Sequence, residues 1–193
     1  MLKLRFLIIV LFTQLSCSVW AQTRQVEGIS FEEGITIDKH KLVLNGIGLN
    51  QQLSEKISVL GLYLPSKQTT SQGASSVQGA KRIELVYLRK VSSKAMSRYL
   101  MKAMRDSDEK SELLKDPQAL ADFGRIFDTA GDRAAGDRVT IDWIPGRGME
   151  MKVGGKAKGE PINSEALYRL LINSVTGPKA KEKMRDGLLG TLK

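Results

Sequence analysis

The sequence predicts a single α+β domain, chiefly from the order of its segments. Strand-like segments come first, helical segments occupy the middle, and a hairpin followed by further helices completes the chain, which is not the alternating order of βαβ units. The chain has 193 residues, of which 41% are hydrophobic and 26% charged, the balance of one globular domain. Its one cysteine excludes an intrachain disulfide framework and a thiolate metal site.

The first 21 residues have the pattern of a secretory signal peptide. Two basic residues precede an apolar run over residues 6–12, and Val19 and Ala21 stand at the two positions where a signal peptidase requires small residues. The apolar run is too short to remain as a membrane-spanning helix. We therefore expect a signal peptide at residues 1–21, a mature domain at residues 22–193 and a periplasmic location.

Cys17 raises a lipid anchor as the alternative to free secretion. A bacterial lipobox has a small residue directly before its cysteine, which Ser16 supplies, and a leucine three positions before it, where this chain has Gln14. Because of that mismatch, we favour free secretion over lipidation. A mature chain without residues 1–21 contains no cysteine, which suits an oxidising compartment.

Three segments in the N-terminal half have the apolar, β-branched composition of strands. They are residues 28–44, broken at Gly34, residues 57–64 and residues 81–91. In the third segment, Ile83, Leu85 and Tyr87 alternate with a more mixed face. Asn45-Gly-Ile-Gly48 is expected to be a turn with positive φ, and the small polar residues of 66–80 predict a loop.

Helical spacing begins in the middle of the chain. Ser92 or Ser93 is a candidate N-cap for a helix that carries Met96, Tyr99 and Leu100 at helical intervals. Asp116-Pro117 predicts the start of a second helix, because aspartate caps helices well and proline fits the first helical position.

The C-terminal part predicts a hairpin and two further helices. Residues 139–153 form two alternating runs around a glycine-rich turn, and a short strand continues through Ala157. Asn163 or Ser164 is expected to cap a helix that ends at Gly177-Pro178. A last short helix is expected over residues 179–189.

The familiar catalytic and cofactor patterns are absent from the sequence. The single histidine, His40, lies between lysines on a predicted strand and lacks the partners of a metal site or a Ser-His nucleophile. The glycine pairs at residues 46–48 and 146–148 lack the strand-to-helix context of a phosphate loop. Acidic pairs such as Glu32-Glu33 fall at element ends, where solvated charge is the commoner role. The sequence therefore predicts no metal and no cofactor.

The basic surplus of 30 Lys and Arg over 21 Asp and Glu points to an anionic partner or surface. Scattered basic residues and only 6% aromatics argue against nucleic acid. No mature segment approaches 18 apolar residues, so no transmembrane segment is expected. Weak contact with an anionic membrane surface is one interpretation of the basic C-terminal helix, and a solvated helix face is the other. The basic residues in question are Lys179, Lys181, Lys183 and Arg185.

Several blocks, in order along the chain, resemble the bacterial chalcone isomerase-like family. Together they cover nearly all of the mature chain, and they are Leu42–Asn50 with Ile57–Leu64, Lys81–Ser92, Gly136–Gly148 with Gly154, Gly155 and Gly159, and Ser164–Ile172. The resemblance implies an open-faced β-sandwich, in which a large antiparallel sheet carries a helical layer on one face and a cleft lies between them.

The resemblance also implies where a ligand would bind. Plant enzymes of this fold have an arginine after a Gly-x-Gly-x pattern, and here Gly46-Ile-Gly-Leu-Asn50 places an uncharged amide at that position. Their late-helix threonine falls at Leu170, which has no hydroxyl. Both departures argue against chalcone cyclisation. Because relatives with this fold include fatty-acid binders, we expect a non-catalytic protein that holds a small apolar or fatty-acyl ligand in the cleft.

The candidate ligand contacts are Asn50, Tyr63, Tyr87, Tyr99 and Leu170. Core packing is the alternative role for the three tyrosines, because amphipathic aromatic residues usually pack. Two other functions remain open. An intramolecular lyase or isomerase on another substrate would need orientation and a polarising donor, such as Asn50 or a lysine. A structural role at the envelope would use the basic C-terminal helix.

Overall fold

The computed structural model describes residues 22–108, 111 and 116–192. The signal peptide expected at residues 1–21, including Cys17, lies outside the described residues. Within the described ranges, no helix combines the length and the apolar character needed to cross a membrane.

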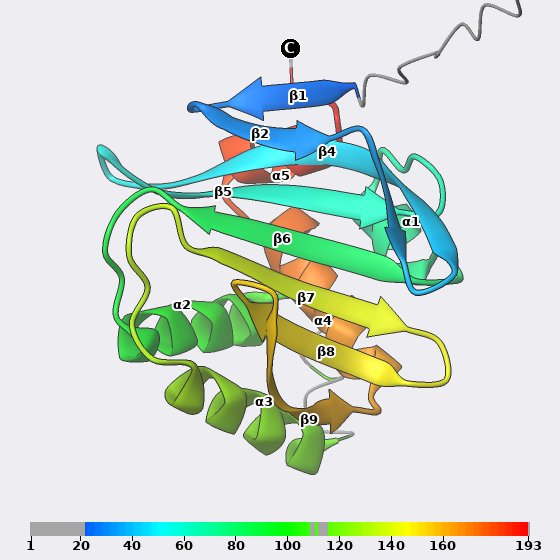
Figure 1. The fold of residues 1–193 in the computed structure, drawn as a ribbon, viewed down its shortest axis with the longest axis vertical. Coiled ribbons are helices and arrows are strands. Elements are labelled where there is room, and N and C mark those ends of the chain that lie inside the picture. Colours follow the sequence, from blue (N-terminus) through cyan, green and yellow to red (C-terminus); the bar gives the residue numbers. More distant parts are fainter. Residues whose placement is uncertain (1–21, 109–110, 112–115, 193) are drawn as a thin grey trace, which may run out of the picture.

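A seven-stranded antiparallel sheet forms the centre of the fold, and its strands follow one another in sequence order (Figure 1). A short hairpin of two further strands, β1 (Thr23–Val26) and β2 (Ile29–Glu32), precedes it. The strands of the large sheet are β3 (Gly34–Ile37), β4 (His40–Gln52), β5 (Glu55–Leu64), β6 (Lys81–Tyr87), β7 (Arg138–Ile144), β8 (Gly148–Val153) and β9 (Lys156–Ile162).

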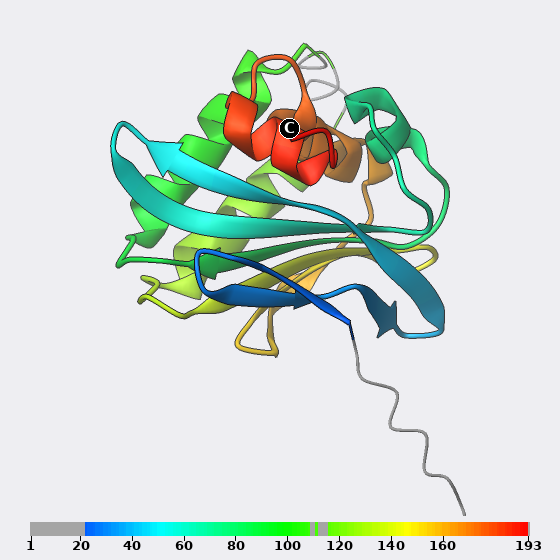
Figure 2. The same ribbon diagram turned by 90° about the horizontal axis from the view of Figure 1, so that it is seen from above.

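Helices gather on one side of this sheet, and the β1–β2 hairpin lies on the other (Figure 2). The helices are α1 (Ser71–Ser76), α2 (Ser93–Asp106), α3 (Pro117–Ala130), α4 (Glu165–Thr176) and α5 (Glu182–Leu188). The predicted α+β class and the antiparallel sheet with a helical layer on one face are confirmed.

Three of the predicted helix starts are confirmed by their caps. The side chains of Ser92, Asp116 and Ser164 each accept a hydrogen bond from the backbone N–H three residues later, at the starts of α2, α3 and α4. Each cap satisfies an N–H group that has no partner within its own helix, and this fixes where the helix begins.

Alternation along the strands divides the buried residues into two apolar clusters. On β5, Leu60, Leu62 and Leu64 face the helices and belong to the larger, inner cluster. Val59 and Tyr63 face the β1–β2 hairpin and belong to the smaller, outer cluster. Successive strand residues point to opposite faces, so position along a strand decides which cluster a side chain joins.

The predicted turn at Asn45-Gly-Ile-Gly48 is wrong, because these residues lie inside β4. The strand continues to pair with β5 through this region, with a β-bulge between Leu44 and Gly46. Neither Gly46 nor Gly48 has a positive φ. The glycines serve packing instead. A Cβ on Gly46 or Gly48 would overlap backbone atoms of α5, which lies directly against this part of the strand.

Other boundaries also differ from the prediction. The segment 66–80 contains the short helix α1, capped by Thr70 and anchored by the fully buried Ala74. The predicted strand over residues 28–44 is divided among three strands, and the last helix begins at Glu182 instead of residue 179. The glycine turns of the late hairpin are confirmed, since Gly146, Gly148 and the following pair at 154–155 have positive φ.

Candidate ligand-binding cavity and groove

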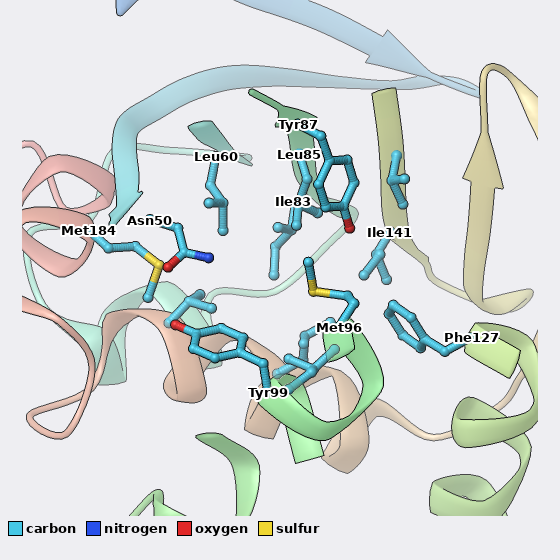
Figure 3. Close-up of a pocket in the computed structure, with 14 residues that line it drawn as sticks. Asn50, Leu60, Ile83, Leu85, Tyr87, Met96, Tyr99, Phe127, Ile141 and Met184 are labelled. Atoms are coloured by element: carbon cyan, nitrogen blue, oxygen red, sulfur yellow. The ribbon is translucent and has the colours of Figure 1, made fainter. Parts of the chain in front are cut away.

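A small apolar cavity of about 30 Å³ lies between the helix-facing side of the sheet and α2 (Figure 3). Strand residues such as Leu60, Ile83 and Ile141 form its roof, and helix residues such as Met96 and Phe127 face them. None of the lining residues that the structure describes carries a charge. The alternation of the strands and the helical spacing of α2 together bring these apolar side chains to one place.

Among the described residues that line the cavity, Asn50 is the only polar one that is not aromatic. Its side chain is buried, at 3% exposure, and its Nδ2 donates a hydrogen bond of 3.4 Å to Ser58 Oγ on the neighbouring strand. Its Oδ1 is buried and has no hydrogen-bond partner among the described residues. A buried carbonyl-type oxygen without a donor is costly, so this atom is ready to accept a hydrogen bond from a ligand.

Two tyrosines add hydroxyl groups to the lining. Burial raises the pKa of Tyr87 to about 12, against a smaller opposing effect of Arg133. Burial also raises the pKa of Tyr99, and the Lys181 ammonium lies 5.9 Å from the centre of its ring. Both hydroxyls therefore stay protonated near neutral pH and can donate hydrogen bonds, but neither supplies a phenolate base.

A surface groove of about 450 Å³ adjoins the cavity. Asn50, Met96 and Tyr99 line both, so these three side chains form the boundary between the enclosed space and the open one. The groove runs beside the start of α2, and its wall includes four basic residues. They are Arg89, Lys90, Arg98 and Lys102.

Two of these four basic residues are already paired with acids. Arg89 pairs with Glu55, and Lys102 pairs with Asp106 within α2. Lys90 and Arg98 are exposed and form no ion pair with any acidic residue of the described ranges. The groove therefore offers two cations that can meet an anionic group from outside the protein.

The structure brings three of the five predicted contacts together. Asn50, Tyr87 and Tyr99 line the cavity. Tyr63 lies on the opposite face of the sheet, because it is one residue out of step with Leu60, Leu62 and Leu64 on β5. Its ring is buried in the outer cluster and lines a separate groove beside Arg82, Glu84 and Arg138. Burial, reinforced by Glu84, raises the pKa of Tyr63.

Leu170 is fully buried but does not line the cavity. Its neighbour Leu171 does, because α4 turns about 100° per residue and presents the next position to this space. Sequence reasoning also did not assign a site role to Met96, Met184, Lys90 and Arg98. Helical spacing marked Met96 as inward-facing, yet only the assembled fold shows that it separates the cavity from the groove.

The groups in the cavity can orient a molecule and bind it, through apolar contact, one free acceptor and two neutral hydroxyls. In the part of the chain that the structure describes, no group of three or more His, Cys, Asp and Glu side chains is placed to hold a metal ion. His40 begins β4 and is not part of the cavity lining.

Comparison with known proteins places the fold. No match was found among curated proteins. The structure is similar to the crystal structure of a fatty-acid binding protein from Arabidopsis thaliana, with a TM-score of 0.67 and 14% sequence identity. The match covers 87% of this chain and 96% of that one. Residues 23–190 match the family described as chalcone isomerase-like, and the chain therefore belongs to that family.

Proposed function

We propose that this protein binds a fatty acid or a similar apolar carboxylate, without catalysing a reaction, in the space between the sheet and α2. The observation that carries the proposal is an apolar, uncharged cavity that shares three lining side chains with a groove whose cations include Lys90 and Arg98. An acyl chain matches the first part and a carboxylate the second. The similar plant structure is that of a fatty-acid binding protein, which supports the proposal.

The cavity must enlarge before it can hold an acyl chain. Its volume of about 30 Å³ is far below the roughly 300 Å³ or more of ordinary small-molecule sites. Methionines line it on two sides, with Met96 on α2 and Met184 on α5. Because methionine side chains are flexible and unbranched, they can rearrange at low cost when a ligand enters. A shift of α2 away from the sheet would join the cavity to the groove.

The test is displacement of a fluorescent fatty acid by dodecanoic acid. Met96→Trp should weaken binding about tenfold or more, because the indole would fill the junction of cavity and groove. Tyr63→Phe, on the opposite face of the sheet, is the control and should bind like the wild type. Wild-type protein that binds no fatty acid, or a Met96→Trp variant that folds and binds normally, would contradict the proposal.

The role of the groove cations can be measured separately. The double variant Lys90→Gln, Arg98→Gln should bind dodecanoic acid about threefold to tenfold more weakly, because exposed ion pairs contribute about 0.2–1 kcal/mol each. Its affinity for dodecanol should not change. Lys94→Gln is the matched control, since Lys94 is an exposed residue of α2 that does not line the groove.

Catalysis of the chalcone isomerase type is the competing function. Uncharged Asn50 and two neutral tyrosine hydroxyls offer a developing phenolate weaker stabilisation than a guanidinium would. We expect chalcone absorbance to decay in the presence of the protein at the rate seen in buffer. An accelerated decay that disappears in Asn50→Ala would replace the binding proposal with an enzymatic one.

We also propose that the protein works in the periplasm after removal of residues 1–21. The supporting pattern is the basic, apolar and small-residue order of the N-terminus together with a mature chain free of cysteine. Weak contact with anionic membrane lipid would bring the groove close to a source of acyl chains. Cell fractionation of the full-length chain tests the location, and recovery of unprocessed protein in the cytoplasm would contradict it.

A further inference from the structure

Asn50 contributes an unsatisfied acceptor where the cavity adjoins the groove. It lines both the cavity and the groove, so it stands between the space suited to the tail and the space suited to the carboxylate. Its side chain is 3% exposed, and its Oδ1 has no hydrogen-bond partner among the described residues. Figure 3 shows the amide projecting from β4 into the cavity beside Met184.

The amide is held in this position by its surroundings. Asn50 pairs directly with Ser58 on β5, and its Nδ2 donates to Ser58 Oγ at 3.4 Å. This contact uses the donor side of the amide, and Figure 3 shows the acceptor oxygen on the side of Met184. Met96 and Tyr99 of α2 line the same junction, so a ligand that enters there lies against the Asn50 amide.

An unsubstituted acyl chain would cover Oδ1 with methylene groups. The acceptor would then lie in an apolar contact with no donor, which is the costly arrangement for a buried polar group. A hydroxyl on the chain at this point would donate to Oδ1 and remove that cost. The hydroxyl would have to be near the carboxylate end, because the carboxylate occupies the adjoining groove while the remaining carbons continue into the cavity.

We propose that the site selects hydroxylated fatty acids, with the hydroxyl close to the carboxylate, over the corresponding unsubstituted acids. This inference rests on the proposed function, since it requires that acyl chains enter between the sheet and α2. Asn50 is then the residue that determines specificity. The groove cations attract any carboxylate, whereas the buried acceptor distinguishes between chains.

Isothermal titration calorimetry with dodecanoic, 2-hydroxydodecanoic and 3-hydroxydodecanoic acid tests the inference. In the wild type, at least one hydroxy acid should bind about tenfold more tightly than dodecanoic acid, the effect expected when a buried acceptor gains its donor. Asn50→Leu, which keeps the shape and removes the acceptor, should abolish that difference. Gln51→Leu changes another amide of the same strand, one that lines neither the cavity nor the groove, and it should preserve the difference.

The outcomes separate the two proposals. If dodecanoic acid binds and neither hydroxy acid binds more tightly, the inference about Asn50 is overturned and the proposed function stands. If none of the three acids binds, the proposed function fails as well. The comparison of the three acids in the wild type needs no variant, so it decides the matter even if Asn50→Leu does not fold.

Discussion

Lys81 is a buried cation that is only partly compensated. Its side chain has no exposed surface, and its Nζ lies 3.7 Å from Glu165 Oε1, too far for a good hydrogen bond. Among the described residues, Nζ has no hydrogen-bond partner. Burial lowers the pKa of Lys81, although the Glu165 carboxylate opposes the effect. Because Glu165 remains 42% exposed, it can be solvated without the lysine.

Lys81→Met should therefore be tolerated or stabilising. We expect a free energy of unfolding at pH 7 equal to that of the wild type or higher by up to about 2 kcal/mol, as seen when apolar residues replace buried charges. Chemical denaturation at pH 7 measures this. A loss of more than about 1 kcal/mol would show that the ion pair stabilises the fold.

The same variant should change how stability depends on pH. The unfolded chain keeps the Lys81 proton up to a pKa near 10.5, whereas the folded protein releases it at lower pH. Between those two values the unfolded state binds more protons, so the wild type gains stability relative to Lys81→Met as pH rises. Denaturation of both proteins at several pH values up to 10 measures the difference, and a constant difference would contradict the pKa direction.

At the residue scale, interactions between residues close in sequence could be predicted, whereas those that depend on residues far away in the sequence could not. The caps Ser92, Asp116 and Ser164 could be predicted because a cap bonds to backbone three residues away. The free acceptor of Asn50 depends on Ser58 and on what faces it from α2, which sequence patterns do not show. Tyr63 was a plausible contact until the alternation of β5 placed it on the other face.

Packing of β4 against α5 depends on glycines in both elements. A Cβ on Gly48 would overlap the Met184 carbonyl oxygen, and a Cβ on Gly187 would overlap that of Ile47. The side chain of Asn45 also joins the two elements, because its Nδ2 donates to Leu188 O at 2.7 Å. The backbones of α5 and β4 therefore lie in close contact. From α5, the side chain of Met184 reaches the cavity.

Gly48→Ala should push β4 and α5 apart and lower the stability of the fold. We expect a loss of about 1–3 kcal/mol in the free energy of unfolding, the usual cost of forcing an extra group into a packed contact. Gly34→Ala in β3 is the matched control, since its nearest neighbour would be Leu42 O at 3.6 Å, an ordinary contact. Thermal denaturation compares the two, and equal stabilities would contradict this account of the glycines.

At the element scale, the wrongly predicted segments were those whose composition reflects packing against elements far away in the sequence. Gly46 and Gly48 resembled turn residues because glycine usually interrupts a strand. They are strand residues whose missing side chains allow α5 to pack closely against β4. The helix α1 has only six residues, mostly small and polar, and no apolar periodicity that could predict it. By contrast, β5 was recognisable from its near-continuous apolar run, and the β7–β8 hairpin from its alternation.

The two faces of the large sheet have different roles. The inner face forms the cavity with the helices. The outer face carries the β1–β2 hairpin, whose Phe31 is almost fully buried and would touch any Cβ placed on Gly61. The Arg82 guanidinium forms two hydrogen bonds, at 2.6 and 2.7 Å, with the fully buried Asp142 carboxylate on this face. These contacts stabilise the fold at a distance from the cavity.

Phe31→Ala should lower stability without altering binding. The loss should be about 3–5 kcal/mol, as for other buried phenylalanines replaced by alanine. Well below the unfolding temperature, displacement of a fluorescent fatty acid should match the wild type. Val43→Ala, at an exposed position of β4, is the control for stability. An altered affinity in a folded Phe31→Ala protein would show that the two faces are coupled.

At the scale of the whole molecule, the class of the fold followed from the order of the segments, and the helical layer followed from the ordered resemblance. The arrangement of seven strands in sequence order did not follow from either, because strand pairing is a long-range property. The same holds for the cavity. Its lining comes from β4, β5, β6, β7 and four of the helices, which only the folded chain brings together.

The bulge at Asn45 reverses the facing of β4 partway along its length. Even-numbered residues before it, Leu42 and Leu44, lie in the outer cluster, whereas Gly46 and Asn50 after it face the helices. If Asn45 paired regularly with β5, so that Leu44 and Gly46 again pointed to the same face, both the glycines and the Asn50 amide would turn to the outer face. One residue inserted beside Asn45 would therefore remove helix docking and the proposed ligand selectivity together, whereas substitutions could change either one alone.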